Sequence, residues 1–414
     1  MKCRHCQAEL RLPFLDLGHA PPSNAYLSAA ALRGPETWFP LRILVCESCW
    51  LVQTEDHAGR EALFTDDYAY FSSFSSSWLV HSQRYVDAMI GRFELDADSM
   101  IVEIAANDGY LLQYVKAAGI PCYGVEPTAS TAQAARDRGI DIVQRFFGVE
   151  LGDELAEQGR AADLIAANNV LAHVPDINDF VSGFSALLKP QGVATFEFPH
   201  LLRMVQENQF DTAYHEHYSY LSLTAVSRIF AANGLAVFDV ESLGTHGGSL
   251  RVYAQRRDTG KHELSGAVER ILAEERQAGM EMPEFYSRFQ QQAERVKNDL
   301  LAFLVELRRS GKRVAAYGAA AKGNTLLNFA GVRPDLLPYV VDLNPAKQDK
   351  YLPGSHIPIV AEAVLREDRP EYVLILPWNL KAEVSAQLDY ARQGWHAKLV
   401  TAIPSLSIES GPQA

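Results

Sequence analysis

The sequence predicts an α/β protein of three parts: an N-terminal zinc-binding module, a central Rossmann-like doubly wound sheet and a smaller C-terminal Rossmann-like α/β domain. Two C-x-x-C pairs lie within the first 50 residues, buried strands alternate with helices up to residue 199, and a second alternation starts after Gly311. A chain of 414 residues is too long for one ordinary core, and its 48% hydrophobic and 21% charged residues are typical of globular domains.

The N-terminal part is defined by Cys3 and Cys6 in "KCRHC" and by Cys46 and Cys49 in "VCESC". Paired C-x-x-C units in a chain without a secretion signal favour zinc over disulfides, and four thiolates leave no coordination position for water. We therefore expect a structural Zn²⁺. Reduced thiols without metal and replacement of one cysteine by His5 are the alternatives, and Cys122 is expected to be a small buried hydrophobe.

The central part alternates five apolar strands with helices, after an amphipathic helix that begins at about Ser77. The strands lie within residues 99–108, 121–128, 141–147, 162–176 and 192–199. Strands that are apolar on both faces and separated by helices indicate a parallel doubly wound sheet.

The C-terminal part begins with a helical segment, 267–309, whose apolar residues recur at intervals of three, four and seven, as in an ordinary packing helix. Further strands lie within residues 313–323, 337–344, 372–378 and 397–404. We divide the chain into a zinc-binding domain (1–75), a cofactor domain (76–255), a helical connection (256–310) and a C-terminal Rossmann-like domain (311–414).

The net charge of −13 and the pI of about 5.4 argue against a broad nucleic-acid surface, although a local basic pocket for a phosphate stays possible. No apolar stretch could span a bilayer, and no signal-peptide pattern is present. We expect a cytoplasmic protein, with a monomer favoured, that binds a small molecule and neither nucleic acid nor membrane.

The loop after the first central strand, "VEIAANDG", and Glu126 about twenty residues later predict a cofactor site. This spacing is shared by NAD sites and S-adenosylmethionine sites. Ala105 and Asn107 stand where a dinucleotide loop would need glycine, and added carboxylates suit a sulfonium and an ammonium group better than a pyrophosphate. We favour S-adenosylmethionine and expect its contacts to come from Glu103, Ala105, Asn107, Asp108, Gly109, Glu126, Pro127, Asn168, Asn169 and His173.

A polar cluster, "AYHEHYSYLS", occupies residues 213–222. Histidine suits a general base because its pKa lies near neutrality, tyrosine can stabilise a developing oxyanion, and glutamate can orient an imidazole. Two alternatives remain: a zinc or iron site made by His215, His217 and His246, and a purely structural polar turn.

A second nucleotide-type loop, "YGAAAKGNTLLN", places a lysine near a helix N-terminus, which can hold a diphosphate. Asp342 ends the next strand and suits a ribose. A Rossmann-like half that has lost its ligand is the alternative. The candidate substrate residues are Lys322, Asn324, Thr325, Arg251, Asp342, Trp378 and Asn379.

The chain resembles the zinc-containing nucleotide-sugar C-methyltransferases, which are class I methyltransferases. The motifs include "C-x-x-C … C-x-x-C", "VEIAANDGYLL", "GVEPT", "YHEHYSYLS", "HGGSLRVYA", "YGAAAKGNTLLN" and "LILPWN", in one order along nearly the whole chain. The resemblance implies that Tyr214, Glu216 and His217 are catalytic, with His217 as general base. It also implies a further catalytic tyrosine, Tyr68 or Tyr70. The family's loop usually carries glycine where this chain has Ala105.

The resemblance thus implies an S-adenosylmethionine-dependent C-methyltransferase of a nucleotide-linked 4-keto deoxysugar, acting at C3. The base would remove the hydrogen beside the keto group, and the enolate carbon would take the methyl group. The alternatives are an O- or N-methyltransferase of a related sugar or small metabolite, an NAD-linked enzyme, and a nucleotide-binding protein without catalysis.

Overall fold

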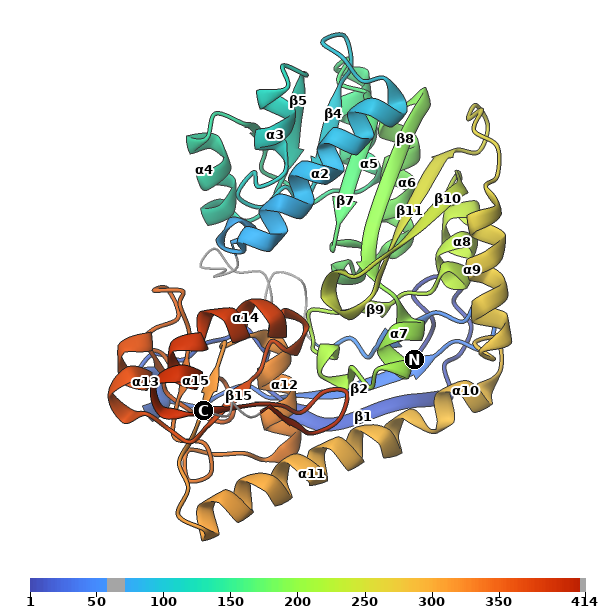
Figure 1. Ribbon diagram of the computed structural model, residues 1–414. Helices are drawn as coiled ribbons and strands as arrows, with labels where there is room; N and C mark the ends of the chain where they lie inside the picture. Colours follow the sequence, from blue (N-terminus) through green and yellow to red (C-terminus); the bar gives the residue numbers. More distant parts are fainter. Residues whose placement is uncertain (58–70, 410–414) are drawn as a thin grey trace.

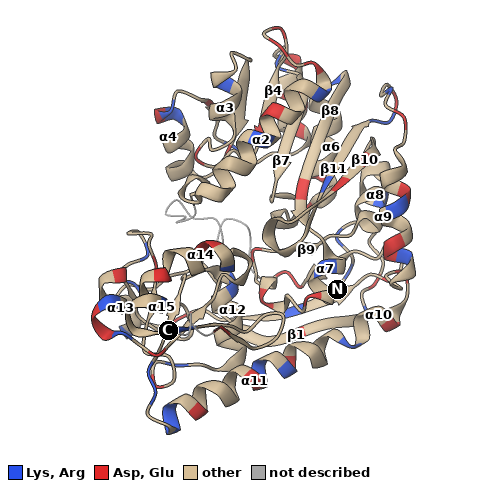
Figure 2. Cartoon of the chain, in the orientation of Figure 1, with Lys and Arg blue, Asp and Glu red and all other residues tan. Residues whose placement is uncertain are grey.

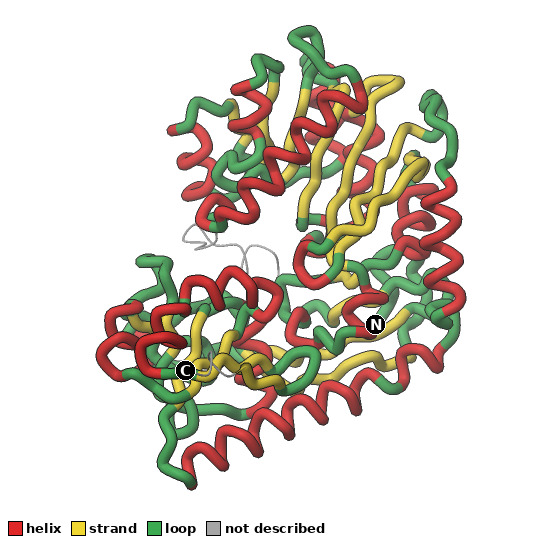
Figure 3. The backbone as a smooth tube through the Cα atoms, in the orientation of Figure 1, coloured by secondary structure: helices red, strands yellow, loops and turns green. Residues whose placement is uncertain are grey.

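The computed structural model describes residues 1–57 and 71–409 and has three β-sheets (Figures 1 and 3). The strand orders are β1-β2-β3-β9, β10-β11-β8-β7-β4-β5-β6 and β14-β13-β12-β15-β16-β17. The predicted α/β class is therefore confirmed. The short N-terminal sheet and the C-terminal sheet form the lower half of Figure 1, and the central sheet stands above them.

The N-terminal sheet is antiparallel and is built from β1 (Leu12–Ala20), β2 (Phe39–Val45) and β3 (Val52–Thr54). Its fourth strand, β9 (Ser219–Tyr220), lies in the second half of the predicted active-site cluster, residues 213–222, and pairs with β3. The zinc-binding module is thereby hydrogen-bonded directly to the segment that carries His217.

Five strands of the central sheet are parallel: β4 (Ile101–Ile104), β5 (Cys122–Val125), β6 (Asp141–Val143), β7 (Ala162–Asn168) and β8 (Leu188–Pro199). These are the five predicted strands. Two antiparallel strands, β10 (Leu235–Leu243) and β11 (Ser249–Arg256), extend the sheet beyond β8 and were not predicted.

The helices of this part are α2 (Ser76–Phe93), α3 (Leu112–Ala117), α4 (Ala129–Asp137), α5 (Val149–Glu157), α6 (Ile177–Leu187), α7 (Leu201–Gln206) and α8 (Leu223–Ala232).

The predicted helical segment 267–309 is interrupted. It consists of α9 (Gly266–Gln277), α10 (Pro283–Ser287) and α11 (Phe289–Arg309), because Gly279 adopts a φ of 88° and Pro283 begins a new helix. The apolar stripe of α11 packs on β1 and on the first helix of the C-terminal domain, as expected of a packing helix. In Figure 2, blue segments (Lys and Arg) and red segments (Asp and Glu) are interspersed along α11.

The C-terminal sheet contains β12 (Val314–Tyr317), β13 (Val340–Val341), β14 (Ile359–Val360), β15 (Tyr372–Ile375), β16 (Lys398–Thr401) and β17 (Ser407–Glu409), and all but β17 are parallel to their neighbours. Its helices are α12 (Ala321–Ala330), α13 (Glu362–Asp368), α14 (Lys381–Gln387) and α15 (Asp389–Trp395).

The N-terminal module shares a hydrophobic core with each of the other two parts. Cys3 and Cys46 belong to the cluster that also contains Phe184 and Phe196 of the central sheet and its helices. Phe14 and Ile43 belong to the cluster that contains Leu300 of α11 and Val340 of the C-terminal sheet. No helix of the described chain combines the length and the apolar character that a membrane span requires.

Candidate functional site

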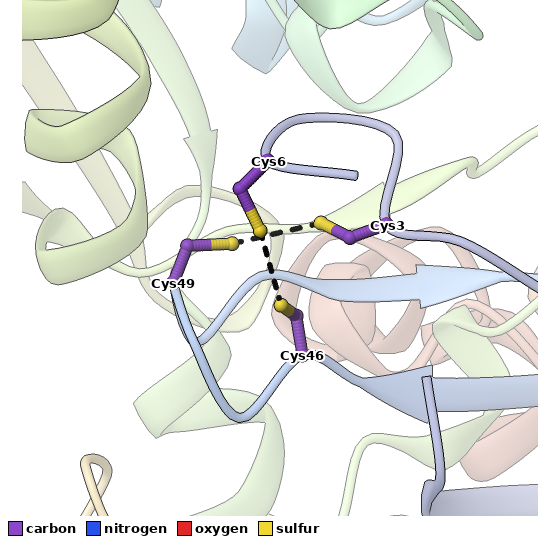
Figure 4. A group of neighbouring side chains, drawn as sticks. All are labelled: Cys3, Cys6, Cys46 and Cys49. Atoms are coloured by element: carbon purple, nitrogen blue, oxygen red, sulfur yellow. Dashed lines mark hydrogen bonds between the residues drawn. The ribbon is translucent and has the colours of Figure 1, made fainter. Parts of the chain in front are cut away.

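The four cysteines of the two C-x-x-C pairs converge on one point (Figure 4). Their sulfur atoms all lie within 4.8 Å of one another, with 3.6 Å between the Sγ atoms of Cys3 and Cys49 and 3.4 Å between those of Cys6 and Cys46. A tetrahedral thiolate site with Zn–S bonds of about 2.3 Å places its sulfurs about 3.8 Å apart. The donor set and its spacing therefore fit the predicted structural Zn²⁺.

A cavity of about 390 Å³ lies where the central sheet, the N-terminal module and the C-terminal domain meet. Its central-sheet wall follows β4, β5 and β7 at their carboxyl ends and includes Ala105, Glu126 and Asn168. Its opposite wall includes Lys322 and Asn379 of the C-terminal domain. This is the edge at which doubly wound sheets bind their ligands, and the volume suits a small molecule.

Tyr214 and His217 lie side by side in this cavity, with 2.7 Å between the Tyr214 hydroxyl oxygen and His217 Nε2. His217 Nδ1 lies 2.8 Å from the main-chain oxygen of Thr212, which can only accept. Burial lowers the pKa of His217 well below its usual value, and nearby His173 and Lys322 lower it further. The ring is therefore neutral near pH 7, donates from Nδ1 and accepts the Tyr214 hydroxyl at Nε2.

Glu216 lines the same cavity, but its carboxylate is held by a residue of the N-terminal module rather than by His217. The Asn24 amide donates to Glu216 Oε2 over 2.6 Å. The expected orientation of the imidazole by this glutamate is not seen, because the Thr212 carbonyl fixes the ring instead. Burial raises the pKa of Glu216 to about 7.

His173 follows β7 and donates from Nδ1 to the main-chain oxygen of Glu216, 2.9 Å away. Its ring meets that of His217 edge to face, with 4.6 Å between the centroids. Burial lowers the pKa of His173 to about 4, so this ring also stays neutral. His173 therefore connects the cofactor residues at the end of β7 with the active-site turn that carries Glu216 and His217.

The predicted cofactor loop turns sharply at two residues that are not glycine. Ala105 has φ 59° and Asn107 φ 49°, and both line the cavity. Glu126 accepts the Asn107 amide at Oε2 and the Thr128 amide at Oε1, each over 2.9 Å. The Oδ1 atoms of Asn168 and Asn169 are buried and have no hydrogen-bond partner among the described residues. These unsatisfied acceptors and Glu126 fit the hydroxyl and ammonium groups of S-adenosylmethionine.

Three residues of the predicted cofactor set lie behind the cavity wall rather than on it. Glu103 is fully buried, and burial raises its pKa well above the usual range, which disfavours the charged form. Asp108 lies 3.1 Å from Arg138 and also accepts from Ser73, so that its charge is compensated. Neither carboxylate lines the cavity, so their predicted contacts with the cofactor stay a prediction. Gly109 has φ 76°, a conformation that favours glycine, and a Cβ there would lie 2.4 Å from Ile140 Cδ1.

Lys322 is a half-buried cation of the C-terminal wall. Its Nζ lies 3.2 Å from Asn379 Oδ1 and 4.7 Å from the centre of the Trp378 ring. Burial lowers the pKa of Lys322 to about 8, while Asp211 acts against that shift. Trp378 does not line the cavity but donates from Nε1 to Asp211 Oδ2 over 2.7 Å, which holds the ring under the lysine.

Four other predicted substrate residues do not line the cavity. Asn324 donates to the main-chain oxygen of Ser23, and Thr325 donates to that of Ala213. Asp342 accepts the backbone amides of Ala319 and Asn344. Arg251 is buried in the central sheet, 2.8 Å from Glu197 and 3.3 Å from Glu241, so that its charge is matched within the protein rather than offered to a phosphate.

The alternative metal site does not form. His215 points away from the cavity, toward the Pro40 oxygen at 3.2 Å and the Phe39 ring. Within residues 1–57 and 71–409, the four-cysteine group is the one set of His, Cys, Asp or Glu side chains close enough to hold a metal. Tyr68 and Tyr70 lie outside the described residues, so their predicted role stays a prediction.

Several cavity residues were missed by the sequence analysis, chiefly Asn24, Trp78, Tyr110, Arg145, Thr212 and Lys347. Tyr110 directly follows the predicted loop and could have been included. His246, considered only as a metal ligand, accepts from Asn169 Nδ2 at 3.1 Å and lines the cavity. Asn24 lies in the loop "PPSNAY", and nothing in that local pattern signals a contact with Glu216.

Family profiles match three consecutive parts of the chain. They are described as "Putative zinc binding domain" for residues 3–64, "Methyltransferase domain" for residues 80–240 and "C-methyltransferase C-terminal domain" for residues 244–404.

Individual proteins are also similar. The chain is 35% identical to the C-methyltransferase NovU of Streptomyces niveus over 383 residues, which is 92% of this chain and 91% of NovU. It is 24% identical to a ubiquinone biosynthesis O-methyltransferase of Chromobacterium violaceum, over 42% of this chain and 80% of that protein. The solved structure of the magnesium protoporphyrin IX methyltransferase of Synechocystis PCC 6803 with bound SAM is 15% identical, with a TM-score of 0.35, and covers 49% of this chain and 100% of that one.

Proposed function

The chain belongs to the C-methyltransferase family that joins a zinc-binding domain to a methyltransferase domain, and from this premise we propose that it methylates carbon C3 of a nucleotide-linked 4-keto deoxysugar. The predicted family, the enzyme class, S-adenosylmethionine as cofactor and the structural zinc are confirmed by these matches together with the four-cysteine cluster. The sugar, its 4-keto group and the position C3 are our proposal.

The Tyr214–His217 pair carries the proposal. A hydrogen on carbon beside a keto group is acidic enough for a neutral imidazole held within hydrogen-bond reach. His217 is neutral and has its lone pair at Nε2, where the Tyr214 hydroxyl donates in the absence of substrate. When the keto oxygen takes over this hydroxyl as its donor, Nε2 becomes available for the carbon-bound hydrogen.

The Thr212 carbonyl then stabilises the protonated ring through Nδ1–H. The Tyr214 hydroxyl meets the oxygen on which negative charge develops. Ala105, Glu126 and Asn168 would hold S-adenosylmethionine, which would supply the methyl group for the new carbon–carbon bond and leave as S-adenosylhomocysteine. Lys322 on the opposite wall suits the negative charge of a nucleotide diphosphate.

Isotope exchange tests the carbon chemistry. Enzyme and a thymidine- or other nucleotide-linked 4-ketosugar are incubated in heavy water, with S-adenosylhomocysteine in place of the methyl donor. We expect deuterium to enter at C3, measured by NMR, and labelled methyl donor to give a C3-methyl product. A methyl group on oxygen or nitrogen without deuterium at carbon would instead support the alternative O- or N-methyltransferase.

The variant His217→Ala should lower kcat by about 10² to 10⁴-fold and leave the dissociation constant of S-adenosylmethionine nearly unchanged, because the imidazole acts in the transition state. His215→Ala is the matched control, since its side chain is a buried neighbour that faces Pro40. Equal losses of kcat in both variants would indicate a structural role for the segment and contradict the assignment.

A further inference from the structure

Asn24 is the point at which the zinc-binding module reaches into the cavity. It lies between β1 and β2, lines the cavity, and its side-chain nitrogen is 2.6 Å from Glu216 Oε2. An amide nitrogen can only donate, so Asn24 supplies a hydrogen bond to the carboxylate. Glu216 is 1% exposed, and a buried carboxylate is expensive without such a donor.

The loop that carries Asn24 is fastened on both sides by the C-terminal domain. Asn324 of α12 donates to the main-chain oxygen of Ser23 over 2.6 Å. The Tyr26 hydroxyl donates to the main-chain oxygen of Ala319 over 2.7 Å. Leu27 and Tyr351 exchange two backbone hydrogen bonds of 2.9 and 2.8 Å. These contacts hold Asn24 in place independently of Glu216.

We propose that Asn24 is a positioning residue that holds the Glu216 side chain at the cavity wall and favours its ionised form, so that the N-terminal module completes the active site. The proposal rests on the proposed function only in taking Glu216 as part of the working site. It also gives Asn324 a role: this residue fastens the Asn24 loop and does not contact the nucleotide.

The electrostatic surroundings of Glu216 leave Asn24 as the main partner of the carboxylate. Burial raises the pKa of Glu216 to about 7, and the side-chain and backbone N–H groups of Asn24 are what lower it against that effect. Titratable side chains that line the same cavity include His173, Tyr214, His217, Lys322 and Lys347, and Glu216 acts electrostatically on Tyr26. His173 and His217 are kept neutral by burial, as described above.

Two substitutions separate a hydrogen-bonding role from a packing role. Asn24→Ala removes the donor and should raise the pKa of Glu216 by about one pH unit. Asn24→Asp keeps the shape but sets a second carboxylate against the first, which should raise it further. The limb of the pH–kcat profile that Glu216 controls should move to higher pH from wild type to Asn24→Ala to Asn24→Asp. If Asn24 served only for packing, the isosteric Asn24→Asp variant would instead have a profile close to that of the wild type.

The titration is measured directly on protein labelled with ¹³C at the glutamate carboxyl carbon, with Glu216→Gln used to assign the signal. Ser23→Ala is the matched control in the same loop. The Ser23 hydroxyl makes a long contact of 3.5 Å with the Thr325 hydroxyl and does not touch Glu216. The expected order of Glu216 pKa values is Asn24→Asp above Asn24→Ala above wild type, with Ser23→Ala equal to wild type.

An unchanged Glu216 titration in Asn24→Asp would overturn the proposal. The Asp variant carries the test alone if Asn24→Ala does not fold. Because the titration needs neither substrate nor methyl donor, it is independent of the reaction. A shifted titration without carbon methylation would refute the proposed function and leave the role of Asn24 intact.

Discussion

The central and C-terminal sheets both place an acidic residue at a strand end, but the surroundings of the two acids differ. In each, an acidic residue at the end of the second strand accepts a backbone amide from the loop after the first strand and another from its own loop. Glu126 accepts from Asn107 and Thr128, each over 2.9 Å. Asp342 accepts from Ala319 over 2.7 Å and from Asn344 over 2.8 Å.

The surroundings of the two acids differ. Glu126 lines the cavity and has no basic side chain paired with it within the described chain. Asp342 lies behind the cavity and is faced by Lys347, with 3.8 Å between Nζ and Oδ2. Lys347 also donates to the main-chain oxygen of Ala319, which holds the loop shut around the acid. A strand-end acid therefore indicates a ribose site only if no internal cation has already matched its charge.

The first residue of each loop also differs. Ala105 has φ 59° and lines the cavity, whereas Gly318 has φ 86° and would place a Cβ 2.5 Å from Pro377 Cδ. The cofactor loop tolerates an alanine because its side chain has space. The C-terminal loop is packed so closely that only glycine fits.

The largest expected effect comes from removing the module that supports both sheets. Cys3→Ser should release the zinc and unfold the N-terminal module, because the binding free energy of structural zinc is on the order of 10 kcal/mol. Elemental analysis and thermal unfolding measure the effect. Cys122→Ser is the control, since this half-buried cysteine lies outside the cluster and should keep the zinc content unchanged. Wild-type protein that binds no zinc would refute the prediction.

Glu216 is a third acid to compare with Glu126 and Asp342. It is buried, and its partner is the neutral amide of Asn24 rather than a cation. Its folded-state pKa of about 7 lies above the ordinary glutamate value of about 4.5, so the folded protein binds the proton more tightly than the unfolded chain. Its contribution to stability is therefore present below about pH 4.5 and is lost as the pH rises to about 7. The unfolding free energy of Glu216→Gln relative to wild type should rise by about 3 kcal/mol over that range. Denaturant titrations at pH 4.5 and 7.5 measure it, and a constant difference would contradict it.

The two strand-end acids form a matched pair of substitutions. Glu126→Ala should weaken binding of S-adenosylmethionine by about 10 to 100-fold, because it removes a carboxylate worth about 1.5 to 3 kcal/mol to a hydrogen-bonded partner. Asp342→Ala should leave that affinity unchanged and lower the free energy of unfolding by about 1 to 3 kcal/mol. Calorimetry with the cofactor and denaturant unfolding separate the two results. Loss of nucleotide affinity in Asp342→Ala at unchanged stability would restore the original ribose assignment.

The smallest expected effect concerns the loop conformation. Ala105→Gly should raise the free energy of unfolding by about 0.5 to 1 kcal/mol, because the left-handed conformation costs alanine more than ordering costs glycine. Gly318→Ala, its counterpart, should be destabilising because of the contact with Pro377. Denaturant unfolding of both proteins gives the comparison, and a destabilised Ala105→Gly would indicate that the alanine methyl makes contacts that outweigh the strain.

Local patterns were sufficient for the elements that local physics controls. The five parallel strands were predicted because each is a short apolar run bounded by turns, and the cysteine spacing was sufficient for the zinc cluster. The antiparallel pair β10 and β11 was missed because its burial is uneven along β10. The break in the helical segment depends on Gly279 and Pro283, which a hydrophobic periodicity does not register.

The sequence alone determined the residue types of the site, because each group needs a particular side chain at a particular spacing. These groups are the two C-x-x-C pairs, the Tyr214–Glu216–His217 set and the strand-end acids. Their partners were decided only by the tertiary structure. Whether Glu216 meets His217 or Asn24 depends on two segments 192 residues apart. Whether Asp342 meets a ribose or Lys347 depends on how the loop after Asp342 folds back on it. Charge and hydrogen bonding act over a few ångströms in space, and the chain sequence does not specify which distant residues come within that range until the domains pack.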